Sequence, residues 1–138
     1  MDIKNFYNQS PKLWKTILGN DLHYHVGWGD GDIFFNSNEY LYQFLERDSK
    51  ILDCGCGWGG TAKVLQRDLN CKVTGITNSS YQHKYIKENI DMDIELVDLH
   101  NYSPKENYNT SLFIESYCHL SNPKKVLNIP KSGSFKVV

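Results

Sequence analysis

The spacing of apolar residues from position 50 onward predicts strands and helices in alternation. Short, β-branched apolar runs predict five strands, at 50–54, 71–76, 93–97, 111–115 and 134–138. Apolar residues at helical spacing predict three intervening helices, over 61–69, 81–89 and 123–127. Such alternation is typical of an α/β protein with right-handed crossovers. We therefore expect a Rossmann-like, doubly wound, mostly parallel sheet of about five strands in the order 3-2-1-4-5.

The chain before this alternation contains two short amphipathic segments. A helix is predicted over 11–18, and four apolar residues share one of its faces: Leu13, Trp14, Ile17 and Leu18. A second helix is predicted over 37–45, and a loop rich in glycine and aromatic residues, 23–32, lies between the two. We expect residues 1–48 to form a helical and aromatic cap, and residues 49–138 to form the nucleotide-binding domain.

An acid and several glycines follow the first predicted strand, in the pattern Asp53-x-Gly55-x-Gly57-x-Gly59. Glycines there allow a tight turn and the close approach of a ligand to the backbone. Gly55, Gly57 and Gly60 formally match a dinucleotide fingerprint, but a carboxylate at the strand end would repel pyrophosphate. It suits the ammonium group of S-adenosylmethionine (SAM), whose own carboxylate can use the helix N-terminus. The turn therefore favours SAM over a dinucleotide.

Several segments resemble one family of enzymes. Residues 51–60 resemble the first motif of class I SAM-dependent methyltransferases. Residues 73–82 are similar to the second-strand segment of the group that contains cyclopropane-fatty-acid synthases and sterol or tocopherol methyltransferases. Residues 113–120 resemble the fourth-strand segment of that group, and 126–135 resemble its turn before strand five. The loop 23–28 resembles the aromatic segment that covers SAM. The joint spacing of these motifs is more specific than any one of them.

The resemblance spans about residues 20–138 and implies how SAM is held. Asp53 would accept from the ammonium group, Thr77 and Gln82 would contact the ribose side, and the loop aromatics would pack on the sulfonium. Asp98 would bind the adenine amino group, with a helix cap as its alternative role. The predicted cofactor-binding residues are Tyr24, Trp28, Asp53, Gly55, Cys56, Gly57, Gly59, Thr77, Asn78, Gln82, Asp98, Leu99 and Ile114.

The same resemblance implies methyl transfer to a small-molecule acceptor at N, O or C. Glu115 and His119 are the candidate catalytic residues, because either could act as a base toward an acceptor. A structural carboxylate and a packed histidine are the alternatives. Cys118 precedes His119 where cyclopropane synthases have a glutamate, which speaks against cyclopropanation.

The resemblance implies seven strands, whereas this sequence stops within the fifth. We therefore expect either a fragment or a chain that another chain completes, and a non-catalytic SAM-binding module is the alternative function. An unpaired fifth strand would invite a homodimer through its edge.

The composition of the chain limits the kinds of partner that we expect it to bind. With 15 basic and 16 acidic residues, the net charge of −1 gives no support for binding nucleic acid. No apolar run approaches the roughly 18 residues of a membrane span, and no secretory signal follows Met1. Cys54 and Cys56 are spaced wrongly for zinc, so we expect no metal, and we expect a cytoplasmic protein with free thiols.

Overall fold

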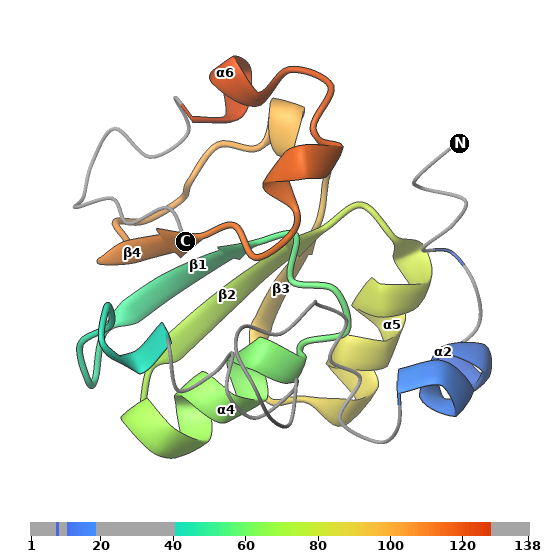
Figure 1. The fold of residues 1–138 in the computed structure, drawn as a ribbon, viewed down its shortest axis with the longest axis horizontal. Coiled ribbons are helices and arrows are strands. Elements are labelled where there is room, and N and C mark those ends of the chain that lie inside the picture. The colour runs from blue at the N-terminus through green and yellow to red at the C-terminus, as the bar shows by residue number, and fades with distance from the viewer. Residues whose placement is uncertain (1–7, 9–10, 19–40, 128–138) are drawn as a thin grey trace, which may run out of the picture.

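The computed structural model describes residue 8 and residues 11–18 and 41–127, which are built around a parallel sheet (Figure 1). Its strands are β1 (Lys50–Cys54), β2 (Lys72–Thr77), β3 (Asp93–Leu96) and β4 (Thr110–Leu112). Its α-helices are α2 (Pro11–Leu18), α4 (Gly60–Leu69), α5 (Ser80–Asn89) and α6 (Pro123–Val126). Two short 3-10 helices follow β3 and β4, namely η1 (Leu99–Asn101) and η2 (Tyr117–His119).

The four strands pair in parallel in the order β3-β2-β1-β4. In the central pair, Ile51 of β1 lies opposite Val73 of β2, and it also pairs with Thr110 of β4. Both central strands are buried along almost their whole length, as expected where helices cover both faces of a parallel sheet. The expected α/β class and the order 3-2-1-4 are confirmed. The predicted fifth strand, 134–138, lies outside the described residues.

Alternating side chains of the strands bury two cores on opposite faces of the sheet. One core joins Ile51 and Val73 to Leu65 of α4. The other joins Leu52 and Ile76 to residues of the segments that follow β3 and β4. Figure 1 shows α4 and α5 on one side of the sheet and α6 on the other. Burying each such side chain contributes about 1.5–3 kcal/mol, so the two cores fix where the strand ends meet.

A third cluster attaches α2 to the domain. Trp14 is 2% exposed, and its ring centroid lies 6.3 Å from that of Trp58, which in turn contacts Tyr85 of α5 edge-on at 5.5 Å. Leu13 and Ile17, however, are 44% and 60% exposed. The predicted helix is present, but its apolar residues are not buried together. The helix is short, and it docks on α5 through the large indole of Trp14 rather than along a stripe.

Most other predicted boundaries agree with the structure to within one or two residues, but the fourth strand does not. It ends at Leu112 rather than at residue 115. Glu115 adopts φ 49°, in the left-handed region, which is incompatible with an extended strand. The chain therefore turns away from the sheet before the residue that was predicted at the strand end.

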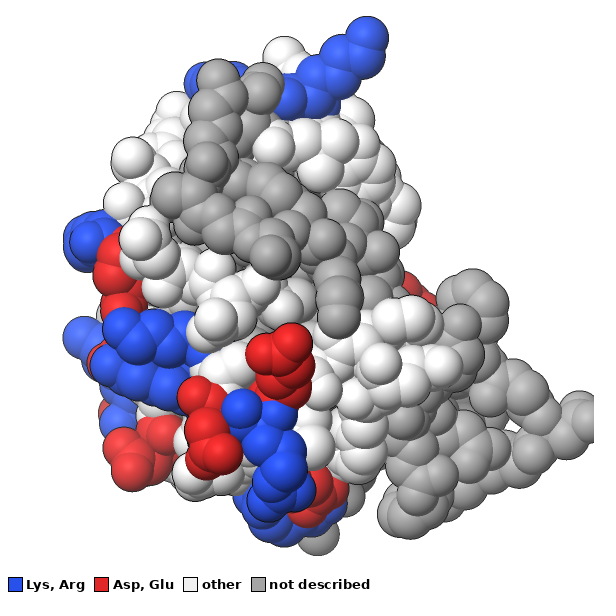
Figure 2. Space-filling view, turned by 90° about the vertical axis from the view of Figure 1, so that its left-hand side faces the viewer, with Lys and Arg blue, Asp and Glu red and all other residues white. Residues whose placement is uncertain are grey.

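Charges of both signs are mixed on the surface. Figure 2 shows lysine and arginine side chains beside aspartate and glutamate over the lower part of one face, without a broad area of one sign. Exposed pairs such as Lys72 with Asp93 and Lys105 with Glu95 have N–O separations of 3.5 and 2.8 Å. Among the described helices, none combines the length and the apolar character that crossing a bilayer requires.

Candidate functional site

The carboxyl end of β1 leads into a turn built on three left-handed glycines. Gly55, Gly57 and Gly59 have φ values of 87°, 55° and 80°, which cost a residue with a side chain about 1–2 kcal/mol each. The N–H groups of Gly55 and Cys56 both donate to the carbonyl of Ile76, at 2.9 and 3.0 Å. These bonds fix the turn against the end of β2.

Ser116 packs on the outside of this turn. A Cβ atom on Gly55 would lie 2.5 Å from the Ser116 Cβ, so no larger residue fits there. The Ser116 hydroxyl donates to the carbonyl of Cys54 at 2.5 Å, which ties the segment after β4 to the end of β1. Nothing in the local pattern distinguishes Ser116 from a loop serine, so this contact could not be predicted from the sequence.

Gly57 differs from its neighbours, because a Cβ atom there would meet no atom of the described residues within 4 Å. This part of the turn faces open space, where a ligand could approach the backbone. Cys56 points the other way: its side chain is 8% exposed, and its sulfur would be 2.7 Å from a Cβ on Gly75. Cys56 could therefore contact a cofactor through its backbone, while its side chain belongs to the core.

Asp53, the residue before Cys54 at the end of β1, is 3% exposed. Within the described part of the chain its carboxylate has no hydrogen bond or ion pair. Burial raises the pKa of Asp53 to about 7, since an apolar environment disfavours the charged form. A cation placed beside it would restore the charge and replace the lost hydration. The geometry thus suits a ligand that carries an ammonium group.

This carboxylate makes stability depend on pH. The folded pKa, about 7, lies above the ordinary 3.8, so the folded state holds its proton more tightly than the unfolded state. We expect the Asp53 contribution to stability to be fully present below pH 4 and to be lost as the pH rises to about 7, by up to about 4 kcal/mol. Urea unfolding at several pH values, without ligand, measures this change. Asp53→Asn should remove that part of the slope, and an identical slope in both proteins would contradict the assignment.

At the end of β2, Thr77 and Gln82 bond to each other. The Thr77 hydroxyl donates to Gln82 Oε1 at 2.7 Å and accepts the N–H of Ser79 at 3.1 Å. Ser79 caps α5 by accepting the Gln82 N–H, and its hydroxyl donates to Asn8 Oδ1 at 2.8 Å. Thr77 and Gln82 are buried, whereas the neighbouring Asn78 is exposed. Their contact with a ribose remains a prediction.

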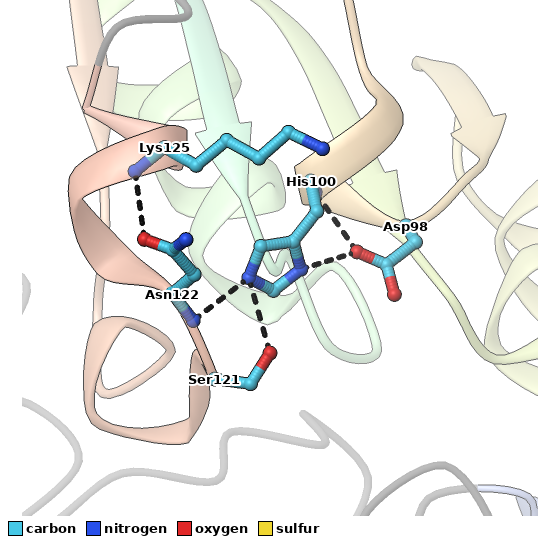
Figure 3. Close-up of polar contacts among 5 residues, drawn as sticks. All are labelled: Asp98, His100, Ser121, Asn122 and Lys125. Carbon is cyan, nitrogen blue, oxygen red and sulfur yellow. Dashed lines mark hydrogen bonds and ion pairs between the residues drawn. The ribbon is translucent and has the colours of Figure 1, made fainter.

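Asp98 lies just beyond β3, and it caps η1. Its Oδ1 accepts the backbone N–H of His100 at 2.8 Å and lies 2.7 Å from His100 Nδ1 (Figure 3). Partial burial alone would raise the pKa of Asp98, but the two hydrogen bonds from His100 and the charges of His100 and Lys125 together lower it. The next residue, Leu99, is 9% exposed and packs into the core, whereas Asp98 keeps about half of its side-chain surface exposed.

The two predicted catalytic residues lie on the segment after β4. Glu115 and His119 are both exposed, and His119 belongs to η2. The left-handed backbone of Glu115 is uncommon for a residue with a side chain and occurs preferentially at functional sites. Ile114, predicted to contact the cofactor, is partly buried against the core.

Two predicted site residues, Tyr24 and Trp28, lie outside the described residues. All four cysteines are free, and only Cys118 is exposed. Across residues 8, 11–18 and 41–127, no group of three histidine, cysteine or acidic side chains could hold a metal ion.

A parallel sheet in the order 3-2-1-4, with an acid-led glycine turn at its carboxyl edge, defines the class I methyltransferase fold. The chain belongs to the mycolic acid cyclopropane synthetase family, whose sequence pattern matches residues 38–112. It is 30% identical over 132 residues to the sterol 24-C-methyltransferase ERG6A of Gibberella zeae, covering 79% of this chain and 34% of that protein. It is 28% identical over 105 residues to the cyclopropane-fatty-acyl-phospholipid synthase of Escherichia coli K12, covering 69% and 28%.

The chain spans about a third of the length of these relatives. Among solved structures, the [4+2]-cyclase SpnF superimposes with a TM-score of 0.78 at 22% identity, over 98% of this chain and 58% of that one. Coclaurine N-methyltransferase superimposes with a TM-score of 0.75 at 21% identity, over 96% and 44%. The fold is thus common to a cyclase and to methyltransferases, so the fold alone does not define the reaction.

Proposed function

We propose that this chain binds SAM at the carboxyl edge of its sheet, as the cofactor domain of a methyltransferase that acts on a small molecule. One observation carries the proposal: a buried carboxylate, Asp53, has no partner among the described residues and stands at the strand end that leads into the turn whose Gly57 faces open space. A dinucleotide would place pyrophosphate near this acid, whereas SAM would offer it an ammonium group.

Each part of the site has a distinct task in this proposal. Asp53 accepts hydrogen bonds from the ammonium group, and the turn 55–59 lets the ligand approach the backbone. Asp98 accepts from the adenine amino group, and Thr77 with Gln82 borders the ribose. When bound, SAM supplies a methyl group that is already activated on its sulfonium. The protein therefore mainly aligns the acceptor and excludes water, with Tyr24 and Trp28 of the cap segment covering the sulfonium.

The acceptor is proposed to meet the methyl group beside the segment that follows β4. Glu115 and His119 are exposed there, and either could take a proton from an amine or a hydroxyl group. For a carbon acceptor, Glu115 could instead stabilise a developing positive charge. The names of the relatives mention a sterol, a tetrahydroprotoberberine and a fatty-acyl phospholipid, which supports a small-molecule or lipid acceptor.

Residues 134–138 would add a fifth strand to the sheet, and residues 1–48 would act as the cap of the domain 49–138. An exposed fifth-strand edge would favour a homodimer, which sedimentation at several concentrations can measure. The four free thiols are in keeping with a cytoplasmic protein.

Calorimetric titration of the chain with SAM, S-adenosylhomocysteine (SAH) and NAD tests the cofactor. We expect SAM and SAH to bind at micromolar concentration or tighter, and NAD to show no saturable binding, because Asp53 would face its pyrophosphate. An assay of methyl transfer to a panel of amine, hydroxyl and sterol acceptors then tests turnover. Tight SAM binding without turnover on any acceptor would indicate a SAM-binding module, and no affinity for SAM or SAH would refute the proposal.

A further inference from the structure

His100 joins two segments that lie far apart in the sequence (Figure 3). Its Nδ1 lies 2.7 Å from Asp98 Oδ1, at the end of β3. Its Nε2 accepts the backbone N–H of Asn122 at 3.1 Å, just before α6, and lies 3.4 Å from the Ser121 hydroxyl. The His100 side chain is 18% exposed, compared with 51% for Asp98, so the ring is held between the two segments.

These contacts determine which ring nitrogen carries the proton. A backbone N–H can only donate, so the Nε2 of His100 must accept from Asn122. A neutral ring then has its proton on Nδ1, and this proton is donated to Asp98. The imidazole therefore links the Asn122 backbone to the Asp98 carboxylate through one hydrogen bond at each ring nitrogen.

Both hydrogen bonds to Asp98 use the same oxygen. Oδ1 accepts from the backbone and from the ring of His100, whereas Oδ2 has no hydrogen bond or ion pair to any other described residue. A carboxylate held through one oxygen presents the other in a fixed direction. Partners of this kind orient the groups that contact a ligand, and their loss weakens binding without removing the ligand contact itself.

The segment that anchors the ring is itself well packed. Asn122 caps α6 by accepting the Lys125 N–H at 3.2 Å. Val126 of α6 is fully buried, in the same core cluster as Leu99, which follows Asp98. The ring of His100 therefore spans two segments whose spacing is fixed by a shared core.

We infer that His100 is a positioning residue: it orients the Asp98 carboxylate toward the amino group of the adenine ring and so sets the preference for adenine over a base without that donor. This inference rests on the proposed function, since it requires SAM or SAH at the site.

The test compares SAH with S-inosylhomocysteine, which has an oxygen in place of the adenine amino group. Calorimetric titration of the full chain gives the ratio of the two dissociation constants. Three variants separate the two ends of the ring: His100→Ala removes both, His100→Gln keeps an acceptor near Nε2, and His100→Asn keeps a donor near Nδ1. We expect the preference for SAH to fall about tenfold in His100→Ala and His100→Gln, and to fall by a smaller factor, about threefold, in His100→Asn, which keeps the donor to Asp98 but loses the anchor on Asn122.

The matched control is His83→Ala, which removes a histidine of α5, the helix that follows β2, and it should leave the preference unchanged. Should His100→Ala fail to fold, the Gln and Asn variants still distinguish the donor from the anchor. An unchanged preference in folded His100→Gln, while the wild type still binds SAH, would overturn this inference alone. A wild-type chain without affinity for SAH would overturn the proposed function and this inference together.

Discussion

Replacing Asp53 by asparagine should abolish tight SAM binding and at the same time stabilise the protein without ligand. The carboxylate is buried and has no partner among the described residues, and its raised pKa, about 7, records the unfavourable free energy of its charge. Asparagine has nearly the same shape but no charge. We expect an increase of about 1–3 kcal/mol in the free energy of unfolding at pH 8, measured in urea. Affinity for SAM should fall at least about 100-fold, because a buried charge pair with the ammonium group is lost.

A gain in stability together with a loss of SAM affinity makes the Asp53→Asn test specific. A residue that merely supports the fold would lose stability and affinity together. Asp93→Asn provides a matched control. Asp93 is the first residue of β3, its side chain is 63% exposed, and it pairs with Lys72. That variant should leave both quantities within about 0.5 kcal/mol of the wild type. Asp53→Asn with unchanged SAM affinity would falsify the assignment of Asp53 to the ammonium group.

The second large effect separates two glycines of the same turn. Gly55→Ala adds a Cβ atom 2.5 Å from the Ser116 Cβ, at a residue with φ 87°. We expect this variant to lose about 3 kcal/mol or more of stability, from steric overlap and backbone strain together. Gly57→Ala adds a Cβ that meets none of the described residues within 4 Å, so it should lose only about 1–2 kcal/mol, the strain of its left-handed backbone.

The effects of these glycine variants on SAM affinity should not follow their effects on stability. Because the Cβ of Gly57→Ala projects into the open space where the cofactor is proposed to lie, SAM affinity should fall at least about tenfold in a protein that remains folded. The double variant Gly55→Ala with Ser116→Gly should recover part of the stability that Gly55→Ala alone loses, because the overlapping atoms are gone. Equal destabilisation at Gly55 and Gly57, or full SAM affinity in Gly57→Ala, would contradict the proposed arrangement.

Much of the fold could be predicted from local pattern. The strand 50–54 is predicted with the bounds that β1 has, because the short apolar run Ile51-Leu52 lies directly before an acid and a glycine-rich turn, a local pattern typical of a buried strand that ends in a turn. The end of the fourth strand was not predictable. Its sequence continues apolar through Ile114, and only the left-handed turn at Glu115 ends it early. Likewise, the face of α2 that is buried depends on where α5 lies, which local periodicity does not contain.

For the candidate site too, some residues could be predicted from the sequence and others could not. Asp53 and the three glycines could be identified because backbone conformation and the chemistry of a strand end are local properties of the chain. Ser116 and His100 could not, because their roles arise from contacts between residues that are distant in sequence: Ser116 with Cys54, and His100 with Asn122. The sequence by itself therefore determined the type of sheet, its turn and the acid that leads it. The tertiary structure alone decided that this acid is buried without a partner among the described residues, and that His100 bridges Asp98 to the backbone of Asn122, because both depend on which segments the two cores bring together.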